Sequence, residues 1–288
     1  MRYLFTFLLI CLVASTFYAQ DAENNWMQSQ GTLQGFEVGN TYFTLVTDAN
    51  VREKPGTQAP VLTKLPIGTP VKIEAVTTDS LTVRGVRMPW LQVSFKENNA
   101  TKKGYIWGGF MATASIQTPD EEVYDNRGVL YLAGVAAFDE NKHQLTAQIR
   151  IAQKGKELAK TEFTTAGDLS YYPSFEVRFG EFDKVKAVLM LNFQYDACGY
   201  PSGDNLVFWQ NNNQLTKVIE TNSVSDGGVF YSVQEYILPN QHGGIADHLI
   251  VTSDEAEFDG EEMKRTKHVY KITLYKWAGG KLVKEKGM

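Results

Sequence analysis

The chain has 288 residues, of which 43% are hydrophobic and 12% aromatic, and 33 acidic against 28 basic residues give it a formal net charge of −5. This length and composition supply enough apolar side chains for about two globular cores, which argues against a largely disordered protein. The negative net charge and the scattered lysines argue against a nucleic-acid partner, because such a partner needs a basic face.

The first twenty residues predict a signal peptide for export. Arg2 gives a positive start, an apolar run follows from Leu4 to Val13, and small and polar residues end at Ala19-Gln20. The run is about ten residues long, too short for a membrane-spanning helix, and no later segment reaches the roughly eighteen apolar residues that a span needs. Cys11 lies inside the run without a small residue before it, so we expect no lipid anchor. The sequence therefore predicts a periplasmic or secreted protein without a transmembrane segment.

Polar stretches divide the rest of the chain. Residues 21–40 are rich in Asn, Gln and Gly, and we interpret them as a lead-in arm with one strand near Phe36-Glu37-Val38. A second polar stretch, residues 115–126, is interpreted as a linker. These boundaries predict a small domain over residues 41–114 and a larger domain over residues 127–288.

The pattern of the larger domain predicts antiparallel β-structure. Short runs of β-branched and aromatic residues alternate with clusters of turn-forming residues, and helical spacing is almost absent. Two hairpins look alike, Leu206 to Leu215 and Ile272 to Leu282, which keeps a small propeller as an alternative to our first choice, a two-layer sandwich or curved meander. The expected strands are Val129–Phe138, Leu145–Gln153, Leu158–Thr165, Ser174–Phe179, Val185–Tyr195, Asn205–Gln210, Leu215–Glu220, Val229–Leu238, His248–Thr252 and His268–Trp277.

The segment from Thr44 to Met111 carries an ordered set of short motifs. In chain order these are Asn50-Val51-Arg52, Pro55-Gly56, Val61-Leu62, Leu65, Gly68, Val71-Lys72-Ile73, Trp90-Leu91-Gln92-Val93, Gly104-Tyr105-Ile106-Trp107 and Phe110. This order resembles the bacterial SH3 (SH3b) family, in which an N-V-R strand leads a long loop, a tryptophan strand follows a glycine turn, and a G-Y/W-V strand ends the barrel. The segment from Thr77 to Pro89 departs from the family, because many relatives have a tighter turn there.

The resemblance implies an all-β protein in which an N-terminal SH3-like barrel precedes the larger antiparallel β domain. It also implies a module that binds and does not catalyse, with a cell-wall glycan or peptide, or an envelope protein, as the partner. We therefore expect a non-enzymatic exported binding protein that recognises a component of the cell envelope. A structural part of an envelope assembly is a further alternative.

Strand alternation selects candidate binding residues, because successive side chains of a strand point to opposite faces. If Leu91 and Ile106 fill the barrel, then Trp90, Tyr105 and Trp107 project from its other face. These three rings form either a stacking surface for a peptide or glycan strand, or a surface that packs on the neighbouring domain or the long insert. Both interpretations stay open from the sequence.

Arg52 is the fourth candidate, with two possible roles. Its planar guanidinium group suits a carboxylate ligand, and it equally suits an internal ion pair or a hydrogen bond that braces the loop after it. The sequence favours the internal role.

The rest of the chain offers little chemistry. Cys198 with His248 gives an alternative hypothesis of a cysteine peptidase or amidase, but the glycines and proline after Cys198 predict a turn and not the helix N-terminus that usually activates a thiol. The histidines lack metal-ligand spacing, and the acidic run Asp254 to Glu262 lacks the register of a calcium loop, so we interpret it as a solvated loop. We expect no metal and no cofactor.

Overall fold

The computed structural model describes residues 26–30, 35–119, 127–166, 172–194, 199–259 and 264–285. These residues form antiparallel strands and one short 3-10 helix, η1 (Gly108–Phe110), and the all-β prediction is confirmed. Within the described ranges, no helix is long and apolar enough to cross a membrane. The predicted signal peptide (1–20), Cys198 and the end of the acidic run (260–262) lie outside the described residues.

The N-terminal barrel is a six-stranded sheet in the order β2-β5-β6-β7-β3-β4. The two ends of the segment that resembles the SH3b family meet, because Thr44 and Met111 form an isolated antiparallel bridge. Side chains of alternate strand residues fill the interior of the barrel as expected, and Leu91, Val93 and Ile106 are fully buried. The strands are β2 (Thr41–Phe43), β3 (Ala49–Arg52), β4 (Val61–Leu65), β5 (Pro70–Val83), β6 (Val86–Glu97) and β7 (Ala100–Trp107).

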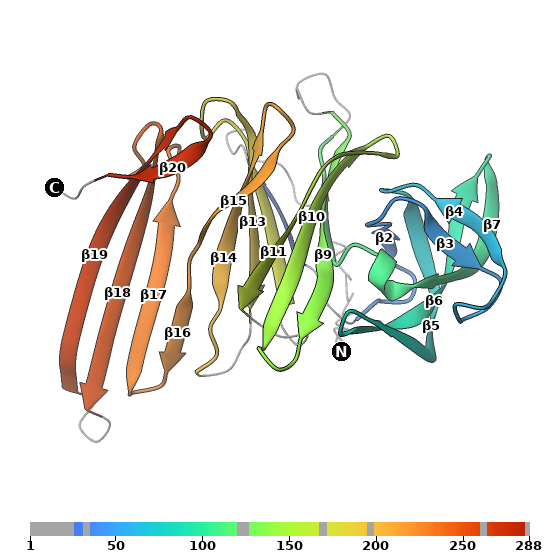
Figure 1. Cartoon of the computed structure of the whole chain (residues 1–288), viewed down its shortest axis with the longest axis horizontal. Coiled ribbons are helices and arrows are strands. Elements are labelled where there is room, and N and C mark those ends of the chain that lie inside the picture. The colour runs from blue at the N-terminus through green and yellow to red at the C-terminus, as the bar shows by residue number, and fades with distance from the viewer. Residues whose placement is uncertain are drawn as a thin grey trace, which may run out of the picture.

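Three further sheets follow along the long axis of the molecule (Figure 1). Sheet I contains β8 (Ala114–Gln117), β9 (Val129–Asp139), β10 (Gln144–Gln153) and β11 (Lys156–Ala166). Sheet II contains β1 (Trp26–Gln30), β12 (Tyr172–Arg178), β13 (Val185–Gln194), β14 (Gly203–Gln210) and β15 (Leu215–Glu220). Sheet III contains β16 (Ser223–Asp226), β17 (Phe230–Ile237), β18 (His248–Asp259), β19 (Lys264–Ala278) and β20 (Lys281–Lys284).

All ten strands predicted for the larger domain are present, and most of their ends differ by a few residues. The exception is β18, which continues seven residues beyond its predicted end at Thr252. The interpretation of the acidic run as a solvated loop is therefore wrong for Asp254 to Asp259, which lie in this strand. The turn chemistry between them also holds, since Lys154-Gly155, Asn213 and Gly279-Gly280 have the positive φ that tight hairpins require.

The segments predicted as irregular contain additional strands. The structure has no strand at Phe36-Glu37-Val38, where Phe36 is instead buried in an irregular segment, and the arm contributes β1 to sheet II. β8 begins at Ala114, so the segment predicted as a linker from residue 115 starts inside sheet I.

The three sheets pack as layers and not as a two-layer sandwich. Sheet II is buried on both faces, because alternate residues of its central strands join different cores. Leu189, Val207 and Trp209 pack with sheet I residues such as Ile149. The intervening residues pack with sheet III in a second core made of Val188, Met190, Leu206, Phe208, Leu238, Leu249 and partly buried rings that include Tyr236, Tyr275 and Trp277.

The similar hairpins of the sequence mark a real repetition of structure. Each sheet contains a four-stranded meander, β8 to β11, β12 to β15 and β17 to β20, and sheets II and III each add one strand beside the first strand of the meander. Stacked four-stranded meanders are the units from which propellers are built. The meander of our first choice therefore describes the connectivity within each sheet, whereas the sheets follow one another along the long axis of the molecule and not radially as propeller blades do (Figure 1).

The barrel packs directly on sheet I. Leu45, Ile67 and Ala112 of the barrel share a buried cluster with Leu130 and Leu132 of β9. The tip of the long β5–β6 hairpin adds a polar contact, since the Phe138 backbone N–H donates to the Arg84 carbonyl at 2.9 Å. Barrel and sheets therefore share a continuous apolar interface.

Candidate functional site

The predicted binding residues lie on neighbouring strands of the barrel. Register pairs Trp90 of β6 with Trp107 of β7, and Gln92 with Tyr105, so these side chains share one face, as alternation predicted. Arg52 of β3 pairs with Tyr105 from the other side. The structure therefore brings all four candidates together.

The two tryptophans are not an open platform, because Trp90 is only 4% exposed and Trp107 only 7%. The Trp107 indole N–H donates to the carbonyls of Leu81, at 3.0 Å, and Met88, at 3.2 Å, both in the β5–β6 hairpin. Its ring also meets the edge of Phe110 at 5.3 Å between centroids. This burial corresponds to the second interpretation from the sequence, in which the rings pack on the insert.

The insert that covers Trp107 is the segment from Thr77 to Pro89, the part that departs from the family pattern. It extends β5 and β6 beyond the barrel as a hairpin, whose turn is Arg84-Gly85 with positive φ at both residues. A Cβ at Gly85 would lie 2.0 Å from the Phe138 carbonyl oxygen, so only glycine permits this approach to β9. The insert thus covers an indole on one side and contacts sheet I with its tip.

A row of accessible polar side chains remains beside the buried rings. Gln92, Tyr105 and Arg52 lie across β6, β7 and β3 and are each partly exposed. Arg52 donates through Nη1 to the Ala59 carbonyl, which braces the loop between β3 and β4. The internal role favoured by the sequence is therefore present, and the rest of the guanidinium fork keeps donors that this bond does not use.

Charged groups flank this row. Glu74 accepts a hydrogen bond from Ser94 at 2.6 Å, and its carboxylate lies 3.9 Å from Lys103. The Ser94 hydrogen bond, helped by the charges of Lys103 and Lys72, holds the pKa of Glu74 below its ordinary value against the opposing effect of desolvation. The surface therefore offers cationic donors, an anionic acceptor and a phenol within one sheet face, which suits a zwitterionic peptide or a polar glycan.

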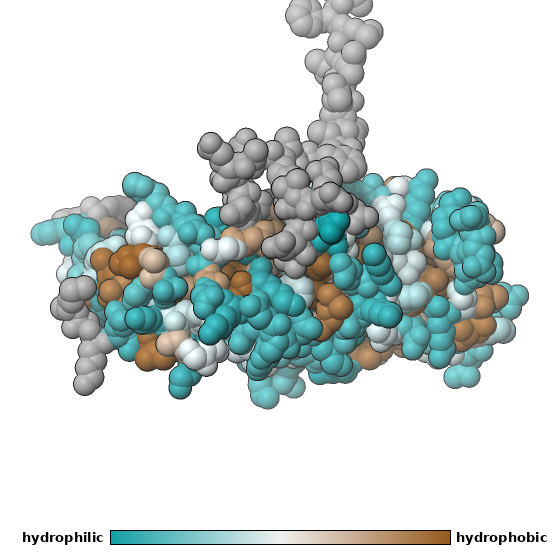
Figure 2. All heavy atoms as spheres, turned by 90° about the horizontal axis from the view of Figure 1, so that it is seen from above, coloured by the Kyte–Doolittle hydropathy of each residue, from teal (hydrophilic) through white to brown (hydrophobic). Residues whose placement is uncertain are grey.

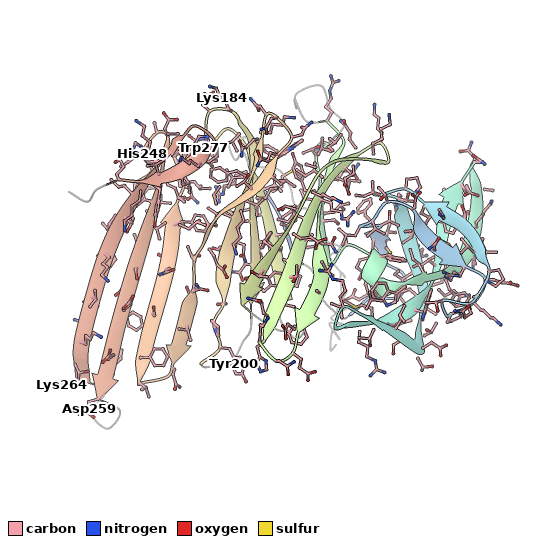
Figure 3. All side chains as sticks on the ribbon, viewed as in Figure 1. Lys184, Tyr200, His248, Asp259, Lys264 and Trp277 are labelled. Carbon is pink, nitrogen blue, oxygen red and sulfur yellow. The ribbon has the colours of Figure 1, made fainter. Side chains whose placement is uncertain are left out.

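A cavity of about 450 Å³ lies elsewhere, in sheet III. It is near the end of the β18–β19 hairpin, where Asp259 and Lys264 are labelled in Figure 3. Phe230 and Ser232 line it together with Glu257 and Lys267, which form an ion pair at 2.7 Å that raises the pKa of the lysine. Glu255 also lines the cavity, so its charged side chains, two glutamates and one lysine, sum to one negative charge.

A polar cluster between sheets II and III was not anticipated from the sequence. Glu176 pairs with Arg178 on β12, and Asn192 donates to Asp204 at 2.7 Å. Burial raises the pKa of both carboxyl groups above the ordinary values, only partly offset by Arg178 for Glu176 and by Asn192 and Tyr236 for Asp204. These residues are far apart in the sequence, and only the pairing of strands places them on one face.

Of the two residues named for the catalytic alternative, the structure describes His248 alone. His248 lies at the upper end of sheet III (Figure 3), with Nδ1 2.7 Å from the Ala246 carbonyl and Nε2 3.4 Å from Glu285. Its proposed partner Cys198 lies outside the described residues. Among the residues that the structure describes, no group of three or more His, Cys, Asp or Glu side chains is arranged to hold a metal ion.

Comparisons with known proteins agree with the geometry of the barrel. Residues 47–112 match a family model described as a bacterial SH3 domain. No curated protein and no solved structure matches the chain. The match covers β3 to β7, five of the six strands of the barrel, and it contains all four candidate binding residues. Residues 47–112 of this chain are therefore a bacterial SH3 domain, joined to three layers of antiparallel sheet.

Proposed function

We propose that this chain is an exported, non-enzymatic binding protein whose SH3 domain recognises a component of the cell envelope. The observation that carries the proposal is the bacterial SH3 domain at residues 47–112, which keeps a partly exposed row of Arg52, Tyr105 and Gln92 although both tryptophans are covered. The signal-peptide pattern of residues 1–20 supports the exported location.

The proposed mechanism is recognition of an extended polar strand along the β6–β7 face. The unused donors of Arg52 bind a carboxylate, the Tyr105 ring packs on the strand, and Gln92 exchanges amide hydrogen bonds with it. Glu74 and Lys103 at the end of the row fix the direction of a strand that carries both charges. The peptide stem of peptidoglycan has this chemistry, and so does a segment of an envelope protein.

The test is co-sedimentation of the purified mature protein with isolated peptidoglycan sacculi. We expect the wild type to bind and a Tyr105→Ala, Gln92→Ala variant to bind at least about tenfold more weakly, because the variant lacks two of the proposed contacts to the ligand. Arg52 is left in place, so the hydrogen bond that braces the loop after β3 is retained. Tyr200→Ala removes an exposed tyrosine just before β14 and serves as the control that retains binding.

We expect the Tyr105→Ala, Gln92→Ala variant to keep the unfolding temperature of the wild type, because both side chains are partly exposed. This measurement is the control for correct folding of the variant. Absence of wild-type binding to sacculi would contradict recognition of peptidoglycan. Binding that survives the double substitution would contradict the site.

A second role, as part of an envelope assembly, is supported by one observation outside the SH3 domain. Sheet III exposes large apolar side chains, among them Tyr270 and Ile272, on one face. Apolar surface of this kind marks an interaction surface.

A further inference from the structure

Strand β19 is open along most of one side. It has 15 residues and pairs with β18 on one side from Lys264 to Lys276. On the other side, β20 pairs only with the last four residues, Tyr275 to Ala278. Among the described residues, no strand pairs with this other side over residues 264–273, which we call the open edge. The strand is the outermost one at the end of the molecule away from the barrel (Figure 1), and Figure 3 labels Lys264 and Trp277 near its two ends.

The backbone groups that point to the open edge follow from the hydrogen bonds at the end of the strand. Alternate residues of an antiparallel strand direct their N–H and C=O groups to opposite sides. The Trp277 N–H donates to the carbonyl of Asp247, just before β18, at 2.9 Å. The Leu274 carbonyl accepts from the N–H of Glu285, just after β20, at 2.9 Å. The same alternation directs to the open edge the backbone groups of Ile272, Tyr270 and His268.

The strands that end the other sheets are protected against pairing with a further strand. β1, β2, β4, β8, β15 and β16 have only three to six residues each, and a short edge strand offers few backbone groups. β11 has 11 residues, but Lys217 of β15 donates to its Thr164 carbonyl at 2.9 Å. β19 contains no proline, and its register with β18 is unbroken from Lys267 to Lys276. It is therefore a long, regular strand that can accept another.

Cationic and apolar side chains lie on opposite faces of the open edge. Lys267 and Lys271 lie on one face, and Tyr270 and Ile272, which are 55% and 61% exposed, lie on the other. Seen from above, this end of the molecule shows hydrophobic residues between polar ones (Figure 2). A strand that pairs with the open edge therefore meets lysines on one face and apolar side chains on the other.

Strand β18 shows which residues pair well with β19. Glu257 of β18 lies directly opposite Lys267 and forms an ion pair with it at 2.7 Å. Lys271 lies opposite Ser253, which is neutral, so no acidic residue of β18 is directly across from this lysine. Opposite charges at directly paired positions stabilise a sheet. A strand on the open side is therefore stabilised by acidic residues opposite the two lysines.

We propose that the open edge of β19 binds an extended segment of another protein in which acidic and apolar residues alternate. The segment adds to sheet III as an antiparallel strand, as the neighbouring strands of this sheet do. Its apolar residues lie opposite Tyr270 and Ile272 and exchange backbone hydrogen bonds with them. Its acidic residues lie opposite Lys267 and Lys271.

The charges of β19 distinguish this partner from a second copy of the same edge. β19 carries no Asp or Glu, so in every register a charged pair between two such edges is a pair of like charges. Lysines on an edge strand normally protect it against self-association, and an acidic strand makes the same lysines attractive. Such binding rests on the second role proposed above, as part of an assembly, and requires no recognition of the wall by the SH3 domain.

The first test is fluorescence anisotropy of a labelled peptide of about eight residues in which Glu and Val alternate, titrated with the full mature chain. We expect Lys271→Glu to raise the dissociation constant at least about tenfold, because it replaces attraction by repulsion. Lys276→Glu is the matched control, since this exposed lysine of the same strand lies where β20 already pairs. It is about 17 Å from Lys271 along the strand, beyond the Debye length of about 10 Å at 0.1 M salt.

A second test separates strand pairing from attraction between charges. N-methylation of the valines removes the N–H groups that face β19 and should abolish binding, whereas N-methylation of the glutamates changes groups that face away and should leave binding intact. A peptide in which Lys replaces Glu should bind the Lys271→Glu variant more tightly than it binds the wild type.

Three outcomes overturn the proposal. These are a Glu–Val peptide that does not bind the wild type at about 1 mM, binding that Lys271→Glu leaves unchanged, and binding that survives N-methylation of the valines. Sedimentation velocity tests the other occupant, because a dimer that forms without peptide and is lost in Lys271→Glu would assign the edge to a second copy. None of these outcomes affects the sacculus assay, which tests the SH3 domain alone.

Discussion

At the scale of single residues, the polar cluster between sheets II and III links ionisation to stability. Glu176 and Asp204 are held between two apolar layers, and burial raises the pKa of each. An acid whose pKa is raised by folding binds its proton more tightly in the native state than in the unfolded chain. The contribution of such a carboxyl group to stability is fully present below its pKa in the unfolded chain. This contribution is lost as pH rises through its higher pKa in the native state.

The free energy of unfolding should therefore fall as pH rises from about 4 towards neutrality, because Glu176 and Asp204 lose their protons at a higher pH in the native state than in the unfolded chain. Asp204→Asn removes one of the charges, keeps the shape of the side chain and should flatten this slope, with a gain in stability at neutral pH. Urea denaturation across this pH range measures the effect, and Asp79→Asn, at an exposed acid, is the control. A slope that Asp204→Asn leaves unchanged would show that the carboxyl group ionises without cost in the native protein.

At the scale of elements, the β5–β6 hairpin is the device that joins the SH3 barrel to sheet I. Its tip approaches β9 so closely that the Phe138 carbonyl oxygen occupies the space of a side chain on Gly85. Arg84 adds a salt bridge of 3.5 Å to Glu162 of β11, which is exposed and contributes little. Backbone contact, not charge, therefore holds the hairpin in place.

Gly85→Ala tests this contact, with Gly243→Ala as a matched control. Both glycines have nearly the same left-handed φ, +80° and +83°, but no atom lies within 4 Å of the Cβ position at Gly243. The control should cost about 1 kcal/mol for the backbone conformation, and Gly85→Ala should cost a further 1–3 kcal/mol, roughly, for the displaced hairpin. Chemical denaturation measures the loss in the free energy of unfolding for both variants. Equal losses would mean that the tip of the hairpin does not pack against β9.

At the scale of the whole molecule, the barrel and the sheets form one continuous stack of apolar contacts. Leu45 and Ile67 of the barrel are fully buried against Leu130 and Leu132 of sheet I. The SH3 domain is therefore presented on a rigid support, and it does not hang from a flexible tether.

We expect the barrel and the sheets next to it to unfold in one cooperative transition. Ile67→Ala, which empties space at the interface, should lower the stability of the whole unit by about 2–4 kcal/mol. Tryptophan fluorescence and far-ultraviolet circular dichroism should report the same midpoint before and after the substitution. Two separate unfolding transitions, of which Ile67→Ala lowers the midpoint of only one, would show that the barrel and the sheets unfold independently.

The sequence by itself determined the features that depend on neighbours along the chain. Alternation located the strands of the larger domain and placed Leu91 and Ile106 inside the barrel, because side-chain direction in a strand is a local property. The order of motifs between Thr44 and Met111 identified the SH3 domain, and register confirmed that Trp90 and Trp107 share a face.

The tertiary structure alone decided which faces are covered. β1 pairs with β12, so Trp26 lies opposite Arg178, and no local pattern reports a partner so distant in the chain. In the same way, folding of the β5–β6 hairpin buries Trp107, and the pairing of β12, β13 and β14 places Glu176 and Asp204 on one face of sheet II. Burial depends on contacts between segments that are distant in the chain. The alternation of residues along a strand assigns each side chain to one of two faces, but it does not identify the segment that covers either face.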